Sequence, residues 1–179
     1  MEKNRSLSNT ATLTACALLT AMAVVMARFL AIVPAPSARI SFETIPIFLA
    51  GMLFGPIAGA LVGFTSDLIG SLMMFGFNPI LCIPPILYGL SAGLFRSVLK
   101  NDRLWSIALA YLPPVVLGSW LWQSMALAMV FGGEARTAKM AYFVTKLTER
   151  GIQFAIVFVV DVLIVYALCK AGVFRRLRS

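Results

Sequence analysis

The sequence predicts an all-α membrane protein, a bundle of six transmembrane helices. Of its 179 residues, 60% are hydrophobic and only 12% are charged, about half of the roughly 25% that a soluble domain carries. Segments 8–27 and 104–133 contain no charged residue, and segment 44–95 contains only Asp67. About 20 apolar helical residues cross a bilayer. These unbroken runs lack the alternation of barrel strands, which indicates helices.

The positions of the basic residues predict the orientation of the bundle. Many Lys and Arg residues lie at the ends of apolar runs, at 3–5, 96–103 and 170–178. This distribution is typical of cytoplasmic loops, and it places both termini in the cytoplasm. The net charge of +8 is therefore not read as a nucleic-acid-binding surface, because no basic stripe with interleaved aromatics lies on a polar face.

The first half of the chain is expected to form four helices. They are predicted at 8–32, from 42–46 to 63, at 66–75 and at 80–98. An outer loop at 33–41 holds two prolines, and a second outer loop covers 76–79. Pro46 falls in a first helical turn, where a proline is tolerated.

The second half is expected to form two longer helices. A polar cytoplasmic turn at 100–103 precedes a helix at 104–131, and an outer loop at 132–136 precedes a helix at 137–171. The prolines 113 and 114 remove two backbone donors, so a kink is expected there. The whole chain, 1–179, is predicted to be one integral membrane substrate-binding domain.

Several basic residues depart from the cytoplasmic pattern and fall in the outer half of this topology. They are Arg28, Arg39, Arg136, Lys139, Lys146 and Arg150. Ionisable residues within a membrane are costly and suggest a functional site. Lys146, Arg150 and Gln153 are spaced i, i+4 and i+7, which places them on one helical face. Arg136 and Lys139 are interpreted as snorkelling side chains. Arg28, Lys146 and Arg150 are predicted to form an outward-facing anion pocket.

Aromatic and polar residues accompany this basic set. Phe42, Trp120 and Trp122 are predicted to contact a flat ring, while Gln123 and Asp67 are predicted to supply hydrogen bonds. Asp67 follows Thr65-Ser66 and is equally well explained as a cap of the helix at 66–75. The predicted ligand is thus an anionic small molecule with a ring.

The motifs that are missing restrict the function. The sequence holds no G-x-x-x-x-G-K-[ST] phosphate loop and no recognisable catalytic set. It has no histidine, the commonest metal ligand, so neither a metal nor a cofactor is expected. It also lacks the inverted halves of a secondary carrier. Movement of a ligand must then be driven by a partner protein. Ala17 and Ala21 have the small-x-x-x-small spacing that lets a partner helix approach closely.

Four segments and one dipeptide carry a resemblance to a known family. The segments are Arg28-Phe-Leu, Arg39-Ile-Ser-Phe-Glu-Thr-Ile-Pro46, Gly51-Met-Leu-Phe-Gly-Pro56 and Gly63-Phe-Thr-Ser-Asp67-Leu-Ile-Gly70, with Asn78-Pro79 in the second outer loop. They resemble the folate-family substrate-binding S components of energy-coupling factor (ECF) transporters. These motifs cover about the first half of the chain. The last two predicted helices match the family mainly in their general character and carry no specific motif.

The resemblance implies a high-affinity vitamin-binding subunit in a bacterial cell membrane, surrounded by lipid. It also implies a transmembrane coupling protein and two ATPase subunits as partners. The pocket would face outward, under the first and third inter-helix loops. Folate suits the residues because its pterin is flat and its glutamate tail carries two carboxylates. Arg28, Arg39, Lys146 and Arg150 would hold that tail, Asn78 would join the site, and Ala17 and Ala21 would be the coupling contacts.

Three alternatives stay open at this point. An S component for riboflavin or thiamine keeps the class, although two basic residues on the last helix disfavour thiamine. A structural scaffold of the cell-wall machinery has similar hydropathy but needs no polar pocket. A membrane enzyme lacks a recognisable catalytic set.

Overall fold

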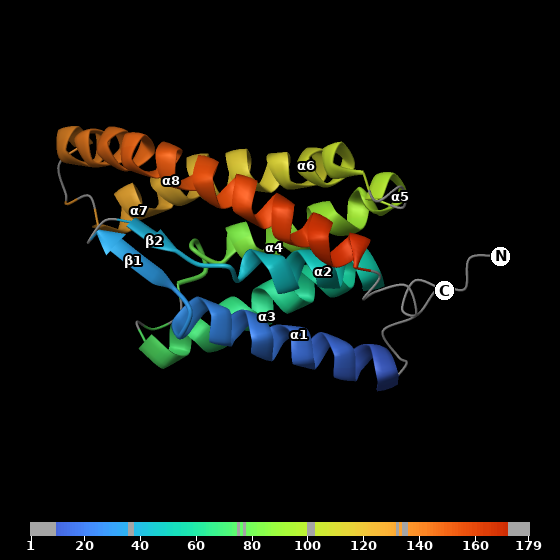
Figure 1. Ribbon diagram of the computed structural model, residues 1–179. Helices are drawn as coiled ribbons and strands as arrows, with labels where there is room; N and C mark the ends of the chain where they lie inside the picture. Colours follow the sequence, from blue (N-terminus) through green and yellow to red (C-terminus); the bar gives the residue numbers. More distant parts are fainter. Residues whose placement is uncertain are drawn as a thin grey trace.

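The computed structural model describes residues 10–35, 38–74, 76, 78–99, 103–131, 133 and 136–171. Its elements are mostly helical and lie side by side along one long axis (Figure 1). In chain order they are α1 (Thr10–Arg28), β1 (Ile32–Ala35), β2 (Ala38–Ile40), α2 (Thr44–Phe54), α3 (Pro56–Met74), α4 (Ile83–Leu94), α5 (Arg96–Leu99), α6 (Leu104–Pro113), η1 (Pro114–Trp122), α7 (Gln123–Phe131) and α8 (Arg136–Lys170).

The bundle has two distinct ends. The first residues of α1 and the last residues of α8 lie at one end, together with α5 (Figure 1). The β1–β2 hairpin and the start of α8 lie at the opposite end. We refer to these as the terminal end and the hairpin end.

The hairpin differs from the sequence prediction, which gave a loop at 33–41 in an all-α protein. Ile32 pairs with Ile40 and Ala35 with Ala38 in antiparallel fashion. Two short extended segments can satisfy part of each other's backbone hydrogen-bonding capacity in this way. Four residues and three residues leave too little periodicity for a strand pattern to be recognised in the sequence.

The boundary between α2 and α3 also differs from the prediction, which placed the helix break near residues 64–65. The chain instead breaks at Gly55, whose φ of 103° lies in the left-handed region. Pro56 then opens α3, since a first-turn proline needs no backbone donor. As a result α3 spans 19 residues and places Asp67 in the interior of a helix, not at its start.

Helices α2, α3 and α4 pack with their backbones in contact. A Cβ added at Gly51 would collide with the Gly89 carbonyl oxygen, and one at Gly89 would collide with the Gly59 backbone. Gly93 lies in the same way against Pro56. Residues 45–53 of α2 are all buried, so α2 is the central helix of this group. Small residues permit such approach without a loss of packing.

An aromatic group joins α2 to the second half of the bundle. The rings of Phe48 and Tyr111 stack with centroids 4.0 Å apart, and Tyr88 meets Tyr111 edge-on at 5.8 Å. All three side chains are buried. Ring pairs of this kind stabilise a core beyond the area that they bury.

The predicted helix at 104–131 is present and contains the expected irregularity. Pro113 ends α6, and the nine residues of η1 that follow form a π-helix before α7 begins. The missing amide donors at Pro113 and Pro114 interrupt the regular hydrogen-bond ladder, and π-helical segments are frequent at functional sites. The predicted helix at 80–98 is shorter, because α4 ends at Leu94 and α5 follows as a separate turn.

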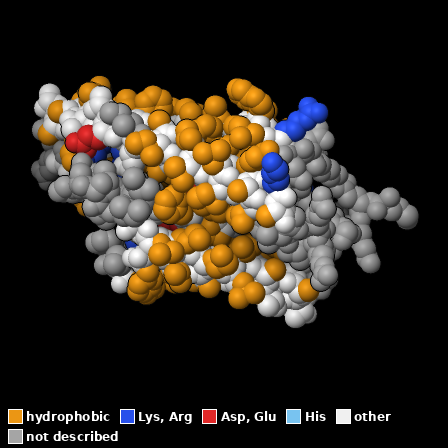
Figure 2. All heavy atoms as spheres, viewed as in Figure 1, with side chains coloured by type: hydrophobic (Ala, Val, Ile, Leu, Met, Phe, Trp, Pro, Cys, Tyr) orange, Lys and Arg blue, Asp and Glu red, His pale blue; other side chains and the backbone are white. Residues whose placement is uncertain are grey.

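The surface of the bundle is that of a membrane protein. Among the described residues, four helices, at 10–28, 56–73, 104–131 and 137–170, are long and apolar enough to cross a bilayer. Large hydrophobic side chains such as Leu18, Leu72 and Leu117 are about 60% exposed, and hydrophobic side chains cover the middle of the face shown in Figure 2. Water does not favour such a surface, so lipid is its natural surroundings.

Candidate functional site

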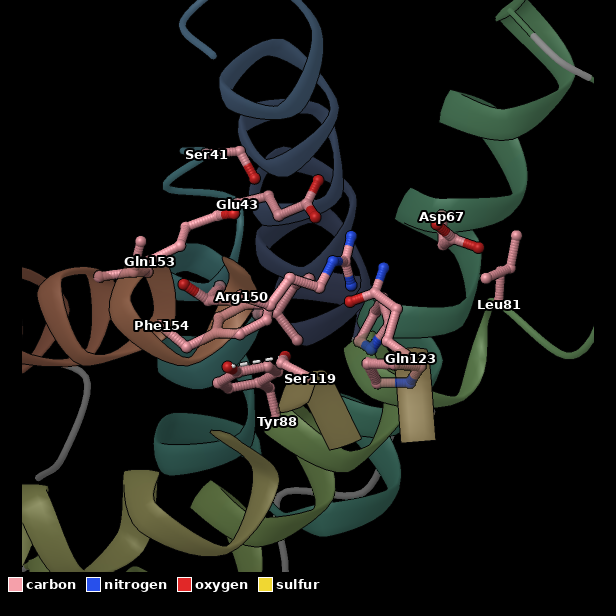
Figure 3. Close-up of a pocket in the computed structure, with 15 residues that line it drawn as sticks. Ser41, Glu43, Asp67, Leu81, Tyr88, Ser119, Gln123, Arg150, Gln153 and Phe154 are labelled. Atoms are coloured by element: carbon pink, nitrogen blue, oxygen red, sulfur yellow. Dashed lines mark hydrogen bonds between the residues drawn. The ribbon is translucent and has the colours of Figure 1, made fainter. Parts of the chain in front are cut away.

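A cavity of about 190 Å³ lies toward the hairpin end, between the two halves of the bundle (Figure 3). Its wall is built by α2 and the residues before it, α3, α4, η1, α7 and α8. The lining residues are Ser41, Glu43, Thr44, Ile47, Asp67, Leu81, Pro84, Pro85, Tyr88, Ser119, Gln123, Arg150, Gln153, Phe154 and Val157. The wall is rich in polar side chains although the surrounding helices are apolar.

Of the described residues that line this cavity, Arg150 is the only basic one. Its side chain reaches from α8 into the middle of the space, with Glu43 on one side and Gln123 on the other (Figure 3). Its Nε and Nη1 atoms are buried and find no hydrogen-bond partner among the described residues. The guanidinium also lies 5.6 Å from the Phe154 ring centroid. A guanidinium with unsatisfied donors in an enclosed space suits a carboxylate.

Asp67 and Gln123, both predicted as polar partners of a ligand, line the same cavity from α3 and α7. The buried Oδ2 of Asp67 lacks a hydrogen-bond partner within the described part of the chain. The alternative role of Asp67 as a helix cap is excluded, because α3 begins eleven residues earlier at Pro56. Two of the sequence-predicted polar residues thus share one space with Arg150.

Arg28 lies close to this space but does not line it. Its guanidinium packs over Gly70 of α3, where a side chain would leave no room for it. The positive charge is near enough to act on Asp67. Gly70 therefore allows the end of α1 to reach across α3 toward the cavity.

Lys146 lies outside the cavity lining. Its Nζ forms a salt bridge of 2.7 Å with Glu149 and sits 5.6 Å from the Tyr142 ring centroid. The predicted i, i+4, i+7 face is therefore divided. Arg150 and Gln153 point into the cavity, whereas Lys146 is engaged within its own helix.

Both tryptophans predicted to stack on a ligand ring also lie outside the cavity lining. The Nε1 of Trp120 donates to the Leu147 carbonyl oxygen at 2.9 Å, and that of Trp122 donates to the Ile80 carbonyl oxygen at 2.9 Å. Trp120 lines an apolar groove between η1 and α8, and Trp122 lines a second apolar groove. Each indole has its polar atom satisfied by the backbone.

The remaining predicted site residues surround the cavity at different places. Phe42 is partly buried and packs against the hydrophobic core. Asn78 accepts a hydrogen bond from the Ile80 amide at 3.1 Å and so shapes the turn before α4. Arg39 belongs to β2, but its side chain lies outside the described residues. Ala17 and Ala21 are exposed on α1, in the middle part of that helix.

The sequence reasoning missed the floor of the cavity. Tyr88 Oη and Ser119 Oγ lie 3.0 Å apart and join α4 to η1. Glu43 and Gln153 also line the space. For Ser119, the available signal was a polar residue close to Gln123 within a mostly apolar segment. No signal in the sequence identified Tyr88, because an isolated tyrosine is equally typical of a core.

Within the described ranges, no group of three His, Cys, Asp or Glu side chains is placed to hold a metal ion. The arrangement instead offers a guanidinium, amides, hydroxyls and carboxylates around an enclosed space. Such a set of groups binds a polar small molecule through several convergent hydrogen bonds.

Comparison with known proteins identifies the family. Residues 11–176 match the family model described as the substrate-specific component of ECF transporters. The chain belongs to this family. The resemblance inferred from the motifs is thereby confirmed, and the family is a transporter substrate-binding component, not an enzyme.

Two relatives are similar over most of the chain. A folate transporter FolT from Clostridium novyi (strain NT) is 31% identical over 140 residues, which cover 74% of this chain and 75% of the relative. A crystal structure of FolT bound with folic acid is 28% identical with a TM-score of 0.72, covering 89% of this chain and 93% of that one.

A third comparison concerns the fold alone. The S component of a bacterial ECF transporter has a TM-score of 0.60 at 21% identity and covers 89% of this chain and 96% of that one. The helical arrangement is therefore shared with S components whose sequences have diverged widely.

Proposed function

We propose that this ECF S component binds folate in the cavity around Arg150. The single observation that carries the proposal is the buried Arg150 guanidinium, which has two nitrogen atoms free of protein partners among the described residues. Burying the donors of a cation without acceptors is costly, so a ligand carboxylate that accepts from these two nitrogen atoms would relieve that cost. The similarity to FolT, including the structure with bound folic acid, supports folate as the source of that carboxylate.

The remaining residues that line the cavity suit the pterin end of folate. Arg150 lies nearer the hairpin end than Val157, because α8 runs from the hairpin end to the terminal end. The glutamate tail then lies toward the hairpin end, and the ring lies against Tyr88, Ser119 and Val157. Arg28, Arg39 and Lys146 add positive charge around the tail, as the sequence analysis proposes.

The volume of the cavity limits how much of the ligand it can enclose. About 190 Å³ is less than the roughly 300–1,000 Å³ of a typical ligand pocket. The described cavity therefore encloses one end of folate, and the segments at its hairpin end move apart to admit the rest.

The proposed topology has six crossings with both termini in the cytoplasm and the cavity facing outward. Four helices have the length for a crossing. The apolar helices α2 and α4, of 11 and 12 residues, supply the other two with the help of flanking segments, because they are buried among longer helices. The terminal end is then cytoplasmic, in agreement with the basic residues near it.

Transport requires partners under this proposal. The chain carries no phosphate-binding loop, so a transmembrane coupling protein and two ATPase subunits would supply the energy. Ala17 and Ala21, exposed in the middle part of α1, are the proposed contacts with the coupling protein. Lipid would surround the rest of the bundle in the bacterial cell membrane.

The alternatives differ in their expected ligand. Riboflavin and thiamine carry no carboxylate and would leave Arg150 unpaired. A cell-wall scaffold would need no cavity of this polarity. Titration calorimetry of the protein in detergent, with folate and then with riboflavin and thiamine as competitors, tests all three. We expect folate binding without ATP and a raised melting temperature, because the ligand binds only the native state. Absence of both heat and a melting shift would overturn the proposal.

A further inference from the structure

Asp161 is a buried acidic residue directly behind the cavity. It is 1% exposed and follows Val157 of the cavity wall by one turn of α8. It is the only charged residue between positions 151 and 169. Its Oδ2 accepts a hydrogen bond from the Thr44 hydroxyl at the start of α2. None of the binding interactions proposed above uses this carboxyl group.

Hydroxyl groups gather around Asp161. Tyr111 is fully buried, and its hydroxyl lies close enough to Thr44 to interact with it. Asp161 lies near enough to Tyr111 and Tyr88 to interact with them electrostatically. Tyr111 meets Tyr88 edge-on at 5.8 Å, and Tyr88 continues to Ser119 through the 3.0 Å contact in the cavity floor. A polar layer therefore links the carboxyl group to the floor that a ligand ring would touch.

The direction of the Thr44 hydrogen bond has a consequence for the ligand. A hydroxyl group has one hydrogen and two acceptor lone pairs. When Thr44 donates that hydrogen to Asp161, only its lone pairs remain available. Thr44 also lines the cavity. It can therefore accept a hydrogen bond from a ligand but cannot donate one.

We infer that Asp161 is a positioning residue that makes the cavity select a ring with an N–H donor at its inner end. Asp161 does not touch the ligand and acts through Thr44. The inference rests on the proposed folate function and adds a specificity element to it. The 2-amino group of the pterin is a donor of the required kind. A methoxy group at that place offers only an acceptor, and Thr44 has no hydrogen left to donate to it.

The test compares folic acid with an analogue whose ring amino group is replaced by methoxy, which accepts a hydrogen bond but cannot donate one, measured by calorimetry on the full chain in detergent. The wild-type protein should prefer folic acid by on the order of tenfold, the effect of one neutral hydrogen bond. Asp161→Leu frees the Thr44 hydrogen, and the preference should fall by about threefold to tenfold. Asp161→Asn keeps an acceptor oxygen and should retain the preference.

Two further variants separate positioning from packing. Thr44→Val removes the acceptor and should abolish the preference, and adding Asp161→Leu to it should change the preference no further, since both act through one contact. Val165→Ala, at another buried position of α8, should lower the melting temperature and leave the preference unchanged. If Asp161→Leu does not fold, Thr44→Val compared with Thr44→Ser supplies the same measurement.

The outcomes distinguish this inference from the proposed function. If the wild-type protein binds neither ligand, the folate function is wrong and the inference falls with it. If it binds both ligands equally, folate binding stands and the role of Thr44 is overturned. Equal weakening of both ligands by Asp161→Leu would show that Asp161 only joins α2 to α8.

Discussion

The two walls of the cavity are built in different ways. The wall formed by α2, α3 and α4 has its backbones in contact through Gly51, Gly59 and Gly89. The wall formed by η1, α7 and α8 meets the rest through long side chains, including Arg150 and Phe154. Apolar grooves remain along that second wall.

As a result, the first wall determines the dimensions of the cavity and the second wall supplies the groups that contact a ligand. Backbone contact leaves no space for side-chain rearrangement, so the first wall fixes the dimensions of the cavity. The second wall carries the cation and the Gln123 amide, and its side chains can adjust to a ligand. Substitutions in the first wall should therefore affect stability, whereas those in the second wall should affect ligand binding.

The largest effect is expected for Gly89→Ala in the first wall. The added methyl group would collide with the Gly59 backbone, and two helices would have to separate. We expect a loss of about 3 kcal/mol or more in stability, at the upper end for overpacking. Thermal unfolding of the purified protein in detergent measures it.

Gly118→Ala in the second wall is the matched control. There the added methyl group meets the end of the Leu87 side chain at 3.2 Å, which can move. Its melting temperature should stay close to that of the wild-type protein. A similar loss in both variants would contradict the contrast between the walls.

The next effect in size is expected for Arg150→Ala. Loss of a charge-assisted hydrogen bond to a carboxylate costs roughly 1.5–3 kcal/mol, so folate affinity should fall about ten- to a hundredfold. Lys146→Ala should weaken folate less, since Lys146 already pairs with Glu149 at 2.7 Å. Calorimetry with folate and with a pterin that lacks the glutamate tail measures both variants.

The pterin that lacks the glutamate tail shows whether a loss of folate affinity comes from the tail contact or from a disturbed fold. It should bind the wild-type protein and both variants with nearly equal affinity. Equal losses for folate and for the tail-less pterin would show that Arg150 supports the fold and does not hold the tail.

The fold was predictable where hydropathy alone determines it. Charge-free segments such as 104–133 indicated helices at the right places, and the structure has them. The break at Gly55 was missed because the apolar run passes through it without a change in hydropathy, and its cause is the positive φ of one glycine. The hairpin was missed because pairing between 32–35 and 38–40 is a contact across a turn, which short segments do not encode in their periodicity.

The site was predictable where a charge stood out against an apolar background. Asp67, Gln123 and Arg150 are of this kind, and the structure places them in one cavity. The sequence did not separate them from Lys146, because a partner such as Glu149 at i+3 becomes visible only once rotamers are known. Nor did it reveal that Trp120 faces a groove.

A third prediction concerns substitutions that reduce transport and leave ligand binding intact. Ala17 and Ala21 are exposed on α1, so Ala17→Trp or Ala21→Trp should leave the fold and folate affinity of the isolated protein nearly unchanged. A bulky side chain there would hold a partner helix away. Uptake by vesicles that carry the partner proteins should fall by about tenfold, with expression level as the control. Normal uptake in both variants would remove these residues from the coupling surface.

The smallest effect on folate affinity is expected for Trp120→Phe. This variant tests whether the tryptophan side chains of the second wall contact the ligand. The change removes the 2.9 Å hydrogen bond to the Leu147 carbonyl oxygen and leaves an aromatic ring at this position. Stability should fall by about 0.5–1.5 kcal/mol, the net worth of such a bond. Folate affinity should change by less than about threefold, because Trp120 faces the apolar groove outside the cavity lining. Trp122→Phe is the matched variant on the other groove. A tenfold loss of folate affinity in either one would mean that its ring moves into the cavity and stacks on the pterin when the ligand binds.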